Sequence, residues 1–134
     1  MTEKMQYAQF LQANIRRYGW QSFVIKITAV IVALTFLVSA MVAPAALTFA
    51  SGASLWAACG VVLAFLLWCG DGYSADMMDR YSSLYEKTAQ DDGADTKMKL
   101  ERTGLSVKAV WRPTVLAFHL PMMVMLILLG LAAK

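Results

Sequence analysis

Three blocks of apolar residues interrupt an otherwise polar chain. They cover residues 23–43, 53–70 and 113–133, and the one Asp, Glu, Lys or Arg inside them is Lys26. At about 1.5 Å per residue, a helix of roughly 20 residues crosses the hydrocarbon layer of a bilayer, which is about 30 Å thick. The pattern therefore predicts an all-α membrane protein with three transmembrane helices in one domain of 134 residues.

The composition agrees with this prediction. Of all residues, 59 % are hydrophobic and 16 % are charged, whereas soluble domains average about 45–50 % apolar and about 25 % charged residues. Indole rings prefer the membrane–water interfaces, so we expect Trp56 and Trp68 at the two ends of the second span. Lys26 lies near the start of the first span, where its stem can follow the helix and place the ammonium among the headgroups.

The basic residues predict how the chain crosses the membrane. All Lys and Arg residues except Lys134 lie before the first span, at its edge, or between the second and third spans. Positive residues favour the cytoplasmic side of a bacterial membrane. We therefore predict a multi-pass protein of the bacterial inner (cytoplasmic) membrane, with residues 1–22 inside, a short external loop at residues 44–52, and the C-terminus outside.

Residues 1–22 are predicted to form an amphipathic cytoplasmic helix. The apolar positions recur at spacings of three and four, which places them on one face; they are Met5, Ala8, Leu11, Ile15 and Tyr18. This face either lies on the membrane surface or packs on another cytoplasmic helix.

A second cytoplasmic segment, residues 71–112, connects the second and third spans, and we expect the helix of the second span to continue in it to about residue 90. A stripe of large side chains follows one face of this continuation. We call it the tyrosine seam, and it consists of Tyr73, Met77, Tyr81, Leu84 and Tyr85. The seam is either a surface for self-association or for a protein partner, or it packs against residues 1–22 of the same chain.

The rest of this segment carries weaker signals. Residues 91–95 combine three Asp with a Gly, but they lack the alternating ligands and the distal Glu of a calcium loop, so we expect a solvated turn. Residues 96–112 are compatible with a short strand or with an interfacial segment. Trp111, Arg112 and Pro113 then supply an interface anchor, a cation and a proline at the first helical position of the third span.

Polar groups within or beside the spans are the candidate functional residues. His119 lies inside the third span, where a His either titrates and gates a pore or donates one hydrogen bond to a neighbouring helix. Pro121 removes a backbone donor and is expected to kink that helix. Asp71 stands where the second span ends, and we expect it to bind a basic residue such as Arg112 or to cap a kink at the neighbouring glycines.

Nothing in the sequence favours an enzyme. It contains no Ser/His/Asp set, no cluster of metal ligands and no phosphate-binding loop, so we expect neither a cofactor nor a metal. Cys59 and Cys69 are ten residues apart, which on a helix is about 15 Å and too far for a disulfide. The basic residues form no run, which argues against nucleic acid as a partner.

Two stretches resemble a pattern in a group of small bacterial membrane proteins. Residues 68–73 (WCGDGY) and 80–85 (RYSSLY) match a second span that ends in an aromatic and an Asp, followed by a polar helix that closes on aromatic-x-x-Leu-Tyr. Residues 114–121 (TVLAFHLP) resemble that group's third span, with His119 in place of a second aromatic. The group often carries a Glu-Arg pair where this chain has Met78 and Asp79. The architecture is similar to that of SLATT-type membrane proteins.

The resemblance implies a pore-forming or membrane-perturbing effector in bacterial conflict and antiviral defence. Our leading hypothesis is therefore a homo-oligomer in the lipid bilayer whose assembly perturbs or opens the inner membrane. One alternative is a membrane anchor or adaptor that recruits a cytoplasmic protein partner. Another is an immunity protein against a membrane-acting toxin.

Overall fold

The structure is a computed structural model that describes residues 3–42, 52–90 and 107–132. Every regular element in these ranges is a helix: α1 (Glu3–Val42), α3 (Gly52–Gln90), α4 (Val107–Val110) and α5 (Pro113–Ala132). Of these, α1, α3 and α5 are each long and apolar enough to cross a membrane. The predicted all-helical fold with three candidate spans is confirmed. The predicted acidic turn and nearly all of the predicted external loop lie outside the described residues.

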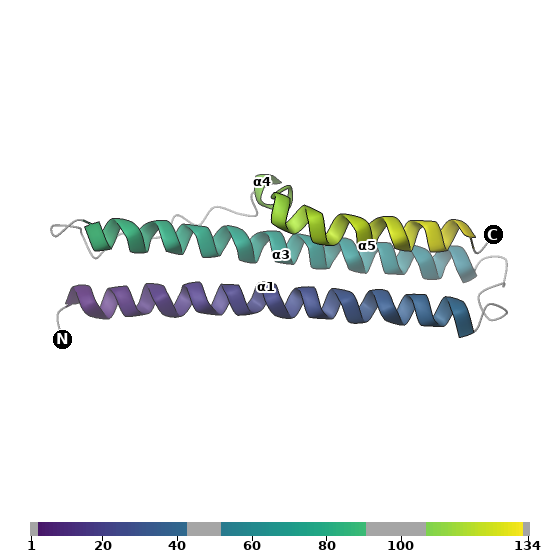
Figure 1. Ribbon diagram of the computed structural model, residues 1–134, viewed down its shortest axis with the longest axis horizontal. Coiled ribbons are helices and arrows are strands. Elements are labelled where there is room, and N and C mark those ends of the chain that lie inside the picture. The colour runs from purple at the N-terminus through teal and green to yellow at the C-terminus, as the bar shows by residue number, and fades with distance from the viewer. Residues whose placement is uncertain (1–2, 43–51, 91–106, 133–134) are drawn as a thin grey trace.

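The two longest helices form an antiparallel hairpin (Figure 1). With 40 residues, α1 rises about 60 Å, and it joins the predicted N-terminal helix and the first span without a break. In the same way α3 runs on to Gln90. Along the hairpin, α5 covers only the half that contains the end of α1 and the start of α3 (Figure 1). We call the uncovered half, residues 3–21 and 73–90, the hairpin extension.

Small residues bring the three long helices together in the covered half. The buried core there consists of Ala29, Ala33, Ala64, Met122 and Leu126. Gly60 lies against Phe36, and a Cβ built at Gly60 would be 2.6 Å from Phe36 Cε1. Close approach at Gly and Ala is how membrane helices gain packing contacts, because lipid tails are as apolar as the side chains that they replace.

The short helix α4 closes over α3 at the start of α5. The indole Nε1 of Trp68 donates a hydrogen bond to the carbonyl of Val110 over 2.8 Å, and Gly72 leaves room for the Val110 backbone, which a Cβ there would approach to 3.0 Å. Trp68, which we expected at a membrane interface, is 6 % exposed and binds α4 through its indole N–H. Of the two alternatives for residues 96–112, the strand is wrong for residues 107–110, which form a helix.

The hairpin extension is held together by aromatic and polar contacts. The ring of Tyr18 stacks on Tyr81 at 5.6 Å between centroids and meets Tyr73 edge-on at 6.4 Å. Gln12 donates a hydrogen bond to the Tyr85 hydroxyl over 2.8 Å. Burial, together with the neighbouring tyrosines, raises the pKa of Tyr18, so this phenol is protonated at neutral pH. Much of the tyrosine seam thus packs on α1 within one chain.

Candidate functional site

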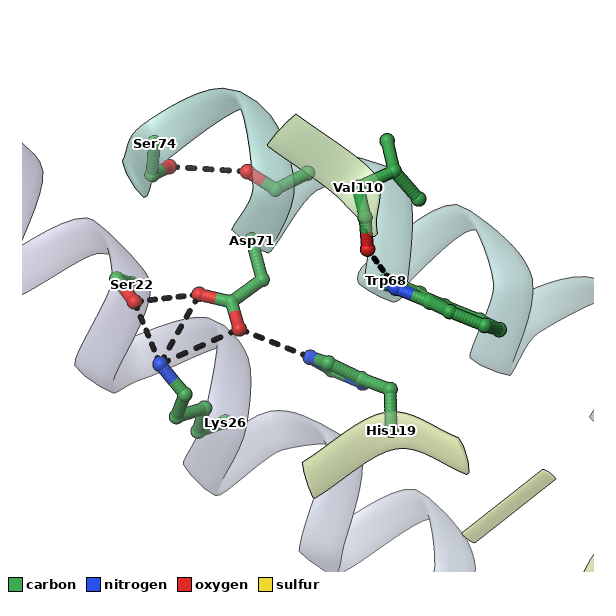
Figure 2. Close-up of polar contacts among 8 residues, drawn as sticks. Ser22, Lys26, Trp68, Asp71, Ser74, Val110 and His119 are labelled. Carbon is green, nitrogen blue, oxygen red and sulfur yellow. Dashed lines mark hydrogen bonds and ion pairs between the residues drawn. The ribbon is translucent and has the colours of Figure 1, made fainter. Parts of the chain in front are cut away.

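Four polar side chains from the three long helices meet inside the bundle. Ser22 and Lys26 come from α1, Asp71 from α3 and His119 from α5 (Figure 2). Asp71 and His119 have no exposed surface. We call these four residues the buried polar cluster.

Asp71 is the centre of the buried polar cluster. Its Oδ1 accepts a hydrogen bond from the Ser22 hydroxyl and lies 3.3 Å from Lys26 Nζ. Its Oδ2 lies 3.2 Å from the same Nζ and 3.0 Å from His119 Nε2. Lys26 also donates to Ser22 Oγ over 2.8 Å. One carboxylate therefore joins α3 to both of the other long helices.

Among the described residues, one of the two ring nitrogens of His119 has a hydrogen-bond partner. His119 Nε2 faces Asp71, while the buried Nδ1 has no hydrogen-bond partner among the described residues. A proton on Nε2 satisfies the contact with a carboxylate, and a proton on Nδ1 would be a buried donor without an acceptor. The geometry therefore favours the neutral tautomer with its proton on Nε2. The ring also lies parallel to that of Trp68, 6.5 Å away.

The charges in the buried polar cluster balance. With His119 neutral, one carboxylate faces one ammonium, and the Lys26 side chain is 32 % exposed. Burying a carboxylate is costly unless its lone pairs find donors, and Ser22, Lys26 and His119 supply them. Removal of any donor leaves Asp71 short of a partner in a place that water reaches poorly.

Asp71 binds a basic residue as expected, but that residue is Lys26 and not Arg112. Arg112 Nη1 lies 2.6 Å from Asp79 Oδ2 instead and donates to the Ala75 carbonyl over 3.3 Å. The Lys26 ammonium lies beside Asp71 because hydrogen bonds between charged groups are stronger than those between neutral ones. The Asp79 pairing fixes the turn before α5 to the side of α3.

The other predicted site residues are distributed differently. Within the tyrosine seam, Met77, Tyr81, Leu84 and Tyr85 are partly buried, whereas Tyr73 is 41 % exposed. Pro121 is exposed and lines a hollow between α1 and α5, and α5 continues as one helix through it.

Sequence reasoning singled out Asp71 and His119 separately and missed that they touch. It also missed Ser22. A signal existed: Ser22 and Lys26 are four residues apart and share a helix face, and the single Lys in an apolar block needed a counter-charge.

The buried polar cluster can stabilise helix packing and can change charge if a proton is gained or lost. It is not arranged for nucleophilic catalysis, because Asp71 stands between Ser22 and His119, whereas a catalytic Ser needs the His beside it. Among the described residues, no group of three or more His, Cys, Asp or Glu side chains is placed to hold a metal ion.

Comparisons of the chain with protein-family models, with curated proteins and with solved structures return no match. The resemblance to SLATT-type proteins therefore stays a prediction, and function has to be argued from the geometry.

Proposed function

We propose that the chain is a homo-oligomeric protein of the bacterial inner membrane whose assembly raises the permeability of that membrane, as an effector in defence or conflict. Its N-terminus and hairpin extension lie in the cytoplasm in this proposal, because nearly all Lys and Arg residues are on that side of the three spans.

A polar flank of α1 carries the proposal. Gln21, Thr28 and Thr35 follow one another at intervals of seven residues, and Ser39 lies one turn further on. At about 100° per residue these positions share one face. Gln21, Thr28 and Thr35 are exposed, and Ser39 is partly exposed. This face points away from the side of α1 that α5 approaches, where Val30 and Leu34 lie.

The hydroxyls of this flank are suited to water. Thr28, Thr35 and Ser39 each donate to the carbonyl four residues earlier, over 2.7–2.9 Å. The donor is thereby satisfied within the helix, and the hydroxyl oxygen remains able to accept a hydrogen bond. Several copies that turn this flank inward would line an aqueous conduit with weak acceptors.

A single protomer does not offer such a conduit. Between the described parts of α1, α3 and α5 the interior is filled by Ala29, Ala64 and Leu126, each at most 2 % exposed. Permeability therefore requires several copies, with α1 nearest the axis and the outer faces of α3 and α5 toward lipid.

Cysteine accessibility tests this arrangement. In a background with Cys59→Ala and Cys69→Ala, Thr28→Cys and Thr35→Cys are compared with Leu34→Cys in liposomes that leak a small dye. We expect a charged thiol reagent added to the water to modify positions 28 and 35 and to reduce the leak, while position 34 reacts at least about tenfold more slowly. Equal reaction at positions 34 and 35 in leaking liposomes would contradict the α1-lined conduit.

The hairpin extension favours a second function, that of a membrane adaptor. Met5, Phe10 and Tyr73 are each more than 40 % exposed there, so large side chains are open to a soluble partner on the side predicted to be cytoplasmic. In this case a soluble partner would bind the chain in a fixed ratio and would be lost on Phe10→Ser, while Phe23→Ser, inside the predicted first span, would retain it. A chain that binds such a partner and causes no leak would favour the adaptor over the conduit.

A further inference from the structure

An apolar groove follows the line where α1 and α5 face each other. The groove consists of two hollows with volumes of about 300 Å³ and about 350 Å³, and Val30 and Phe118 line both of them. On α1 the lining runs from Phe23 to Leu37, and on α5 it runs from Phe118 to Met125. Since α5 packs chiefly on α3 and meets α1 less closely, the groove stays open to the surroundings of the bundle.

The length of the groove fits one lipid chain in one leaflet. Phe23 and Leu37 are 14 residues apart, which is a rise of about 21 Å on a helix. Half of the hydrocarbon layer is about 15 Å thick. An acyl chain that enters at the Phe23 end is therefore covered by protein over the whole depth of its leaflet.

Cationic and aromatic groups stand at the Phe23 end. Lys26 lines the groove there, and its side chain is 32 % exposed although the ammonium also contacts Ser22 and Asp71. Arg16 is exposed and lies seven residues before Phe23, on the same face of α1. The Trp20 ring lies 5.5 Å from that of Phe23, and indoles prefer membrane interfaces.

We propose that this groove binds one anionic glycerophospholipid per protomer, with an acyl chain between α1 and α5 and the phosphate against Lys26 and Arg16. The site takes phosphatidylglycerol in preference to a zwitterionic lipid with the same chains. It goes beyond the proposed function and does not rest on it, because it requires only that the chain lies in a bilayer. It holds for either orientation of the chain in the membrane.

Native mass spectrometry of the detergent-purified full chain tests the site with phosphatidylglycerol and phosphatidylcholine of matched acyl chains. Val30→Trp fills the groove, and Val24→Trp is its matched control, because both valines are 42 % exposed and Val24 lies on another side of α1. Arg16→Gln removes the headgroup charge, and Arg17→Gln removes a neighbouring charge that points about 100° away around the helix.

We expect one phosphatidylglycerol per protomer and weaker retention of phosphatidylcholine. Val30→Trp should lower phosphatidylglycerol retention at least about tenfold and Arg16→Gln about fivefold, the effect of one basic residue at a membrane surface, while both controls bind like the parent chain. Equal retention of the two lipids would overturn the proposal. So would a Val30→Trp chain that keeps its lipid but changes its oligomeric state, since a second copy would then occupy the groove.

Discussion

His119 Nε2 lies 3.0 Å from Asp71 Oδ2, and neither side chain has any exposed surface. The contact joins α5 to α3 across 48 residues of sequence. On the other side of the same carboxylate, Lys26 and Ser22 join α3 to α1. Among the described residues, the buried polar cluster thus links all three long helices through one carboxylate.

The ion pair between Lys26 and Asp71 should contribute measurably to stability. Lys26→Met leaves a buried carboxylate without its cation, which costs about 3–5 kcal/mol when both partners are buried and much less at a surface. Because Lys26 is 32 % exposed, we expect a loss of about 2 kcal/mol in the free energy of unfolding. Titration with sodium dodecyl sulfate in detergent micelles, followed by circular dichroism, measures it.

The double variant supplies the control for that experiment. Lys26→Met with Asp71→Asn removes both charges together and should recover most of the stability that Lys26→Met alone loses. Arg17→Met, which removes an exposed charge, should change stability by less than about 0.5 kcal/mol. If the loss of unfolding free energy in the double variant equals the sum of the losses in Lys26→Met and in Asp71→Asn alone, the two residues are not energetically coupled.

The hydrogen bond of His119 should contribute more to the stability of the fold than the packing of its ring. His119→Phe keeps an aromatic ring beside Trp68 and removes the donor, so we expect a loss of about 1.5–3 kcal/mol, the range for hydrogen bonds to charged groups. His119→Gln retains an N–H that can reach Asp71 and should lose less than half as much. The same titration compares the two variants, and a His119→Phe chain as stable as the parent would show that this contact carries no stability.

Gly60 should tolerate no side chain. Gly60→Ala places a methyl group 2.6 Å from Phe36 Cε1, and we expect overpacking to cost about 1–3 kcal/mol. Phe36→Leu should relieve part of that cost in the double variant. Gly19→Ala is the matched control, because a methyl group there meets Met78 Sδ at an ordinary 3.6 Å, and removal of a helical glycine should stabilise by up to about 1 kcal/mol. A Gly60→Ala chain that is stabilised like Gly19→Ala would contradict the close contact.

The sequence predicted the helices well because their lengths follow from simple physics. An apolar block long enough to cross a bilayer can be predicted without knowledge of tertiary contacts. The continuation of α3 past Asp71 can be predicted as well, because polar and apolar residues keep a helical spacing there. The external loop and the acidic turn remain predictions, since they lie outside the described residues.

The sequence predicted two residues of the buried polar cluster but not the contacts between its members. A His inside a span and an Asp at its end are unusual enough to be singled out from sequence alone. Which cation reaches that Asp depends on the register between α1 and α3. We expected a basic residue such as Arg112, and packing brings Lys26 to Asp71 and Asp79 to Arg112. The hydrogen bond of Trp68 could not be predicted for the same reason, because its acceptor is the Val110 carbonyl on α4.

The central claim, that several copies of this chain together make a membrane permeable, is tested most directly by ion leak from liposomes that contain the purified full chain. We predict a leak that rises more steeply than in proportion to the protein-to-lipid ratio, because each conduit needs more than one protomer. Liposomes that stay as tight as protein-free ones at every ratio, with the chain inserted and helical, would contradict the claim.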